Sequence, residues 1–85
     1  MEVAPETLDA LELDGIWAPY VYMGDLEFLP TRLTIGKDEY GFHSSMIIFG
    51  HGAVLPDRVR ALRAEGKKPI IVEREERYYV YVTPP

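Results

Sequence analysis

The chain has two histidines, His43 and His51, as the side chains best suited to acid–base chemistry. His51 lies between two glycines just before a predicted helix, where backbone N–H groups could contact an anion. The loop lacks the spacing of a nucleotide-binding motif, so a simple turn into the helix is the favoured interpretation. His43 precedes Ser44 and could act as its base, but neighbouring residues of a regular strand point to opposite faces. A small hydrolase is therefore the least favoured function, and we assign no catalytic residue.

Metal binding is not expected from this composition. A protein zinc site needs three or four converging ligands, and the chain has two histidines and no cysteine. Even with Asp57 added, such a site would depend on both histidines of the chain. The absence of cysteine also excludes disulfides and thiolate chemistry. We therefore predict neither a metal nor another cofactor.

A basic stripe on the predicted helix is a second candidate site. Arg60, Arg63 and Lys67 recur at spacings of three and four residues, and Lys68 extends the patch. Such a stripe, with His51 at the start of the helix, could bind the phosphates of a nucleic acid. The competing interpretation is a solvated helix face that pairs with glutamates of the following hairpin. The net charge of −5 also opposes strong non-specific binding to nucleic acid.

Aromatic side chains give the strongest indication of function. The chain has six tyrosines, three phenylalanines and one tryptophan, which is more aromatic surface than so small a core can hide. Tyrosine and tryptophan are favoured at protein interfaces, because each combines a large contact area with a polar tip. Half-buried tyrosines that cover a sheet face are the competing explanation. The residues that we assign to a protein-binding sheet surface are Trp17, Tyr20, Tyr22, Tyr79 and Tyr81.

The elements that must position these residues are clearest in the second half of the chain. A helix is predicted from Pro56 to Gly66, since proline suits the first turn and glycine the stop. Its apolar stripe, which should face the core, consists of Leu55, Val59 and Leu62. Two strands rich in β-branched and aromatic residues follow, at 70–72 and 78–82. The turn between them has no Asn-Gly or Asp-Gly pair, so we expect a connection longer than two residues.

The first half of the chain is predicted to hold three further strands, at residues 17–23, 31–35 and 40–49. In the last of them, regular alternation places Phe42 and Met46 on one face and His43 on the other. Residues 1–14 carry only a weak helical pattern, so we expect an acidic arm that is mobile or short-helical.

These elements, in the order β-β-β-α-β-β, predict a single small α+β domain over residues 1–85. We expect a mostly antiparallel sheet of about five strands with one helix packed on one face. The sequence contains no repeat, no low-complexity tract and no linker that would divide it.

The second half of the chain resembles a family of DNA-binding proteins. The residues that carry the resemblance are Val54, Leu55, Pro56, Val59, Arg60 and Leu62, followed by a glycine and a two-strand hairpin that ends near Thr83 and Pro84. Over about 31 of the 85 residues, this pattern is similar to the swapped-hairpin repressors of transition-state and antitoxin type. The resemblance implies an intertwined dimer that binds DNA. In that family the module usually opens the chain, and a Gly-Asp turn stands where this chain has residues 66–69.

Composition suggests a habitat and a compartment. The chain contains no asparagine, glutamine or cysteine, and depletion of such thermolabile residues is typical of thermophiles. We therefore predict a thermophile, or one of its viruses, as the source. No hydrophobic run approaches the roughly 18 residues of a membrane span. Because the N-terminus is acidic where a signal peptide would be basic, we expect a cytoplasmic protein.

Charge is distributed unevenly along the chain. Nine acids and two bases give residues 1–39 a charge of −7, whereas seven bases and five acids give residues 40–85 a charge of +2. This pattern suggests attraction within a homodimer or a face for a basic partner, with ordinary solvated surfaces as the alternative. The favoured function is a non-enzymatic protein-binding module or accessory regulator that acts through the aromatic sheet surface. The alternative is a dimeric DNA-binding transcription or antitoxin-type regulator that uses the basic stripe.

Overall fold

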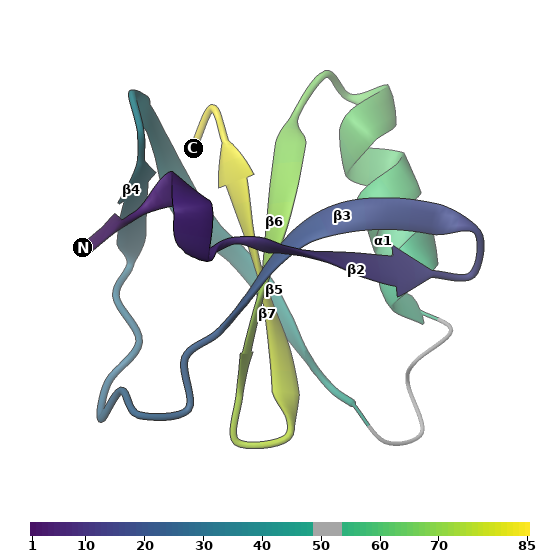
Figure 1. Cartoon of the computed structure of the whole chain (residues 1–85). Coiled ribbons are helices and arrows are strands. Elements are labelled where there is room, and N and C mark those ends of the chain that lie inside the picture. Colours follow the sequence, from purple (N-terminus) through teal and green to yellow (C-terminus); the bar gives the residue numbers. More distant parts are fainter. Residues whose placement is uncertain (49–53) are drawn as a thin grey trace.

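The computed structural model describes residues 1–48 and 54–85, which form one curled sheet with a helix beside it (Figure 1). The chain begins with β1 (Glu2–Val3), the 3-10 helix η1 (Pro5–Thr7) and β2 (Asp9–Leu13). The elements that follow are β3 (Ile16–Tyr22), β4 (Arg32–Ile35), β5 (Asp38–Ile47), α1 (Val54–Ala64), β6 (Lys68–Arg74) and β7 (Arg77–Thr83). Within the described ranges, no helix is both long enough and apolar enough to cross a membrane.

The predicted five-stranded, mostly antiparallel sheet is wrong. Among the described residues, the sheet has seven strands in the order β1-β4-β5-β7-β6-β3-β2. It is mixed, because β1 pairs in parallel with β4 and β3 pairs in parallel with β6. The strands curl strongly into a half-barrel (Figure 1). The class is still α+β, since the single helix of the described residues, α1, connects β5 to β6.

Both additional strands lie within residues 1–14, the segment predicted as an arm or short helix. There β2 pairs with β3 through a two-residue turn, Asp14 and Gly15, whose φ angles are +50° and +91°. Positive φ at both positions is typical of a type I′ turn, for which Asp-Gly is a preferred pair. The Asp-Gly pair is thus a local sequence signal for this hairpin, and the predicted acidic arm over residues 1–14 does not account for it.

The β6–β7 hairpin also closes with two residues, and the prediction of a longer connection is wrong. Glu75 and Glu76 link Arg74 to its partner Arg77, with φ angles of +50° and +61°. The left-handed conformation costs about 1–2 kcal/mol for a residue with a Cβ atom. The seven residue pairs that join β6 to β7 set the register and impose the turn on residues that disfavour it.

A β-bulge in β5 overturns the predicted alternation of its side chains. The register of β5 against β7 shifts between Phe42 and Ser44, which leaves His43 as the extra residue. One extra residue reverses the faces of all later side chains. Phe42 therefore lies on the face of its partner Tyr81, whereas Met46 is buried on the opposite face with the residues of α1.

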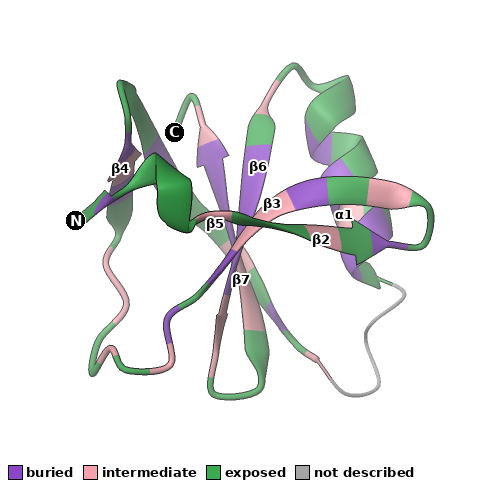
Figure 2. Cartoon of the chain, viewed as in Figure 1, coloured by how far each residue is buried: buried purple, intermediate pink, exposed green. Residues whose placement is uncertain are grey.

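Buried side chains form one cluster on each face of the sheet. Figure 2 marks the buried positions along the strands and the helix. The first cluster lies against α1 and contains Leu13, Ala18, Met46, Leu55, Val59, Leu62, Ile71, Val80 and Val82. The second is enclosed by strands and the β3–β4 loop and contains Val3, Val21, Met23, Leu33, Ile35, Tyr40, Ile70, Val72 and Tyr81. Because β6 and β7 contribute to both clusters, their sequences are apolar at consecutive positions.

The helix ends in a glycine cap, as its sequence predicts. Gly66 has a φ of +81°, and its N–H donates to the carbonyl of Arg63 at 3.0 Å. The N–H of Lys67 donates to the carbonyl of Leu62, also at 3.0 Å. These two bonds are those of a Schellman motif, which satisfies carbonyls that the helix itself leaves unpaired.

The N-terminal segment connects the two edges of the sheet. β1 pairs with β4 at one edge, β2 pairs with β3 at the other, and η1 lies between them in the chain. The Met1 amine donates to the carbonyl of Arg32 at 3.2 Å, and the N–H of Thr34 donates to the carbonyl of Met1 at 2.7 Å. This single segment therefore holds both edges of the half-barrel.

Candidate functional site

An apolar groove lies where the β3–β4 loop meets the sheet. It is lined by Leu29, Pro30 and Thr31 of the loop, Phe42 of β5 and Tyr79 of β7, and we call it the aromatic groove. Its volume is about 260 Å³. The five lining side chains carry no charge, and Thr31 and Tyr79 are those with a hydroxyl group, so the groove is suited to contact with an apolar ligand.

Phe42 and Tyr79 form the aromatic wall of the groove. Their ring centroids are 6.4 Å apart with an interplanar angle of 50°. Phe42 also packs edge-on against Tyr81, with centroids 5.8 Å apart and an angle of 79°. Tyr81 is fully buried, but Phe42 remains 48% exposed. Phe42 is thus supported on one side by the core and open to solvent on the other.

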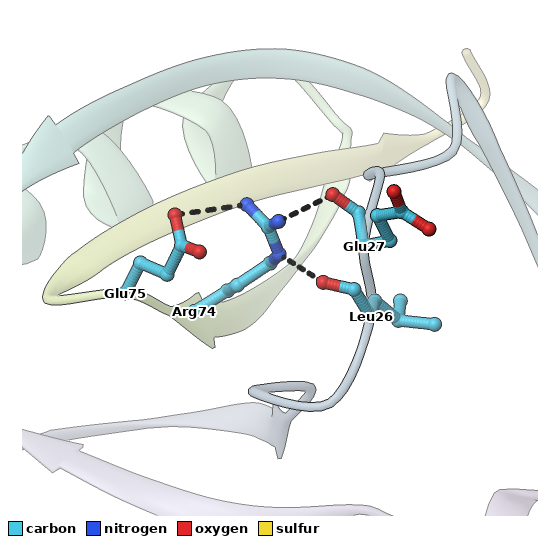
Figure 3. A network of polar contacts seen from close by, with 4 residues as sticks. All are labelled: Leu26, Glu27, Arg74 and Glu75. Atoms are coloured by element: carbon cyan, nitrogen blue, oxygen red, sulfur yellow. Dashed lines mark hydrogen bonds and ion pairs between the residues drawn. The ribbon is translucent and has the colours of Figure 1, made fainter.

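Arg74 holds the first part of the β3–β4 loop (Figure 3). Its Nε donates to the carbonyl of Leu26 at 2.7 Å, and its Nη2 donates to the carbonyl of Glu27 at 2.6 Å. Its Nη1 lies 3.3 Å from a carboxylate oxygen of Glu75, and the Arg74 side chain is only 13% exposed. A planar guanidinium with several fixed donors thus joins two consecutive loop carbonyls to the end of β6.

Tyr81 holds the second part of the same loop. Its buried phenol donates to the carbonyl of Pro30 at 2.6 Å. Burial raises the pKa of the Tyr81 phenol, so the group keeps its proton and remains a donor at neutral pH. Arg74 and Tyr81 therefore attach the loop to β6 and β7 on either side of residue 28.

Between these attachments the loop presents Phe28 to solvent. Phe28 is 79% exposed, the highest value among the exposed large hydrophobic residues of the described chain. Asp25 and Glu27 are exposed on the same loop. Arg74 bonds to the backbone of Glu27, not to its carboxylate (Figure 3). In the sequence, an exposed aromatic ring and two exposed acids therefore come just before the groove-lining residues 29–31.

The aromatic residues predicted as one binding surface are not brought together. Tyr81 is fully buried, and Tyr79 lines the aromatic groove. Trp17 and Tyr22 are 61% and 63% exposed. Because they are five positions apart on β3, they point to opposite faces of the sheet. Only Tyr79 of the predicted set belongs to the groove.

Tyr20, the fifth member of that set, makes a contact within the sheet. Its phenol donates to Oε1 of Glu73 at 2.6 Å, across the parallel pair of β3 and β6. Burial and then the bond to Glu73 raise the pKa of Tyr20 above that of an ordinary tyrosine. Tyr20 thus stabilises the pairing of two strands.

Two arginines of the predicted basic stripe contact the β2–β3 hairpin. Nη2 of Arg63 donates to the carbonyl of Trp17 at 2.7 Å, and Nη2 of Arg60 donates to the carbonyl of Asp14 at 3.3 Å. Arg60 also lies 3.3 Å from a carboxylate oxygen of Asp57. Both guanidinium groups therefore help to attach α1 to the hairpin.

The two lysines predicted to contact an anion or nucleic acid lie beyond that attachment. Lys67 is half-buried after the helix cap, and Lys68 is exposed at the start of β6. His51 lies outside the described residues. Of the predicted set, the structure thus brings together Arg60 and Arg63, and it places both against the hairpin.

His43 contacts Ser44, although a regular strand would separate them. Nδ1 of His43 lies 2.9 Å from Oγ of Ser44, because the bulge interrupts the alternation at this point. Neither residue lines the aromatic groove or the larger pocket, of about 450 Å³, beside β1 and β4. In the described ranges no three His, Asp or Glu side chains gather as metal ligands.

Comparisons of the chain with protein-family models, characterised proteins and solved structures find no match. The functional proposal therefore depends on the geometry of this chain alone.

Five residues of the loop and groove are missed by the sequence prediction, namely Phe28, Leu29, Pro30, Thr31 and Phe42. The apolar run at 28–30 was a usable signal, since it stands in a loop between Glu27 and Thr31. Phe42 could not be assigned, because its face depends on the bulge at His43.

Proposed function

We propose that the protein is a small, non-enzymatic binding module whose aromatic groove takes a short segment of a partner protein. The observation that carries this proposal is the half-exposed ring of Phe42 beside a loop that the side chains of Arg74 and Tyr81 hold in place. Aromatic residues on pre-formed surfaces are the usual anchors of protein interfaces.

The energetics favour binding at this position. The exposed parts of Phe28 and Phe42 contribute little to folding, and each Å² that a partner covers is worth about 25 cal/mol. Because Arg74 and Tyr81 already order the loop, a partner would not bear the cost of ordering it. The uncharged lining of the groove supports a contact role over catalysis.

Selection of a random peptide library against the immobilised protein tests this function. We expect peptides whose affinity falls at least about tenfold, or ~1.4 kcal/mol, for Phe42→Ala and for Phe28→Ala. Phe28 is 79% exposed, so its truncation should leave the melting temperature unchanged and the loss can be assigned to binding. Trp17→Ala is the matched control, since Trp17 is 61% exposed and lies on another strand.

Two results would contradict the proposal. The first is selected peptides that bind Phe42→Ala as tightly as the wild type. The second is an equal loss of affinity in Trp17→Ala, which would indicate general stickiness of exposed aromatic residues rather than a site.

We further propose a thermophilic source, supported by the absence of asparagine, glutamine and cysteine. Calorimetry at neutral pH should then show reversible unfolding above about 65 °C, the upper end of the range for mesophilic domains. A reversible transition below that temperature would remove this part of the proposal.

A further inference from the structure

We infer that the occupant of the aromatic groove is an extended, proline-containing segment that carries a basic residue, an inference that rests on the function proposed above. The volume of the groove, about 260 Å³, is below the roughly 300–1,000 Å³ of typical small-molecule sites, and it suits a few peptide side chains.

The apolar lining selects against peptide N–H groups. A backbone N–H pressed onto Leu29, Pro30 or Phe42 would lose its water without gaining an acceptor. Proline has no N–H and offers an apolar ring in its place. A proline-containing segment also holds its extended conformation before it binds, which lowers the entropy cost of association. Aromatic-lined grooves bind such segments for these reasons.

The charge of the loop selects for a cation on the occupant. Asp25 and Glu27 are both exposed, and neither carboxylate is bound by Arg74, whose donors contact two carbonyls and Glu75. Arg32, at the other end of the loop, is paired with Glu39. These exposed acids lie on the same loop as the lining residues Leu29, Pro30 and Thr31, so they favour an occupant that carries a lysine or arginine.

A second copy of this chain is the poorer occupant. A two-fold contact through the groove would bring the same patch of each copy together. It would place Asp25 and Glu27 of one copy near the same acids of the other, in a chain whose net charge is already −5. The charge pattern thus favours a different, basic partner.

The sequences of peptides selected on the wild-type protein test the inference. Among binders that require Phe42, we expect proline and Lys or Arg to be enriched several-fold over the starting library. In the tightest binder, Pro→Ala should weaken binding at least tenfold. The protein variant Asp25→Asn/Glu27→Gln should bind that peptide at least threefold more weakly than the wild-type protein does. When the basic residue of the peptide is replaced by alanine, the variant and the wild-type protein should bind the peptide equally.

Each contrary result has a distinct meaning. Binders that require Phe42 but contain no enriched proline or base would overturn this inference and leave the proposed binding function intact. Failure to obtain any binder that requires Phe42 would overturn both. Self-association in sedimentation experiments that Phe28→Ala abolishes would identify a second copy as the occupant, and the inference would again be wrong.

Discussion

Glu75 and Glu76 show how a residue can occupy a conformation that its side chain disfavours. Both have positive φ in the β6–β7 turn, and Glu75 additionally lies beside Arg74, which holds the loop of the groove. The two glutamates therefore differ in what a substitution would remove. The backbone of Glu76 has the same positive φ, but its side chain does not contact Arg74 as that of Glu75 does. A substitution at Glu76 therefore tests the turn conformation without removing a contact to Arg74.

Replacement of Glu76 by glycine should stabilise the protein. Glycine adopts positive φ without a Cβ clash, so we expect the free energy of unfolding to rise by about 1 kcal/mol. For a domain of this size that corresponds to roughly 4–8 °C in Tm. Thermal unfolding measures the change, and Ala61→Gly in the exposed face of α1 is the control that should destabilise by about 1 kcal/mol. A lower Tm for Glu76→Gly would show that this turn is not strained.

At the scale of elements, the sequence predicted what depends on near neighbours in the chain. The stripe of Leu55, Val59 and Leu62 and the stop at Gly66 follow from helical spacing, and α1 is found there. Strand pairing is different, because a pair such as β3 with β6 joins residues about fifty positions apart in the numbering. No local pattern reports such a pair. The predicted strand count is wrong for a separate reason, because Asp14 and Gly15 form a hairpin turn at the end of the region predicted as an arm.

The candidate site depends on the same non-local information. The loop is located by its apolar run and its proline, but its rigidity comes from Arg74 and Tyr81, which are distant in the chain. Phe42 reaches the groove only because one extra residue in β5 separates its face from that of Met46. Alternation predicts those two residues on one face, so the groove could not be derived from the sequence.

The glycine cap of α1 can be tested as an element boundary. Gly66→Ala should destabilise the protein by about 1 kcal/mol, because φ is +81° and no neighbouring atom lies within 4 Å of the added Cβ. The loss is thus one of backbone conformation and not of packing. Gly66→Asn should recover much of it, since asparagine tolerates this region. Equal Tm values for the alanine and asparagine variants in thermal melts would contradict this explanation.

At the scale of the whole molecule, buried and partly buried phenols link stability to alkaline pH. Burial is the largest cause that raises the pKa of Tyr20, Tyr40, Tyr78 and Tyr81 in the folded chain. In the unfolded chain these groups titrate near the ordinary value of about 10. Below that pH both states hold their protons, and above it the unfolded state loses protons first. The stabilisation is therefore complete below pH ~10 and is lost as pH rises through the folded-state pKa values.

Denaturant titrations from pH 8 to 11 should show this dependence. We expect the free energy of unfolding to be level at first and to fall as pH rises beyond about 10. Tyr20→Phe should be less stable at neutral pH by about 1 kcal/mol, through loss of the bond to Glu73, and should show a shallower alkaline decline. Tyr22→Phe removes an exposed phenol and serves as the control. A decline of equal steepness in the wild type and Tyr20→Phe would argue against Tyr20 as a contributor.

The position of β7 has a consequence for how the protein is made. This strand is the last in the described chain, yet it lies in the sheet between β5 and β6. A nascent chain that still lacks residues 77–83 has two partial sheets, β1-β4-β5 and β6-β3-β2, with no strand to join them. Folding must therefore wait until β7 has left the ribosome. For the same reason, we expect a fragment of residues 1–76 to bind a synthetic peptide of residues 77–85. The peptide would complete the sheet by pairing with both β5 and β6.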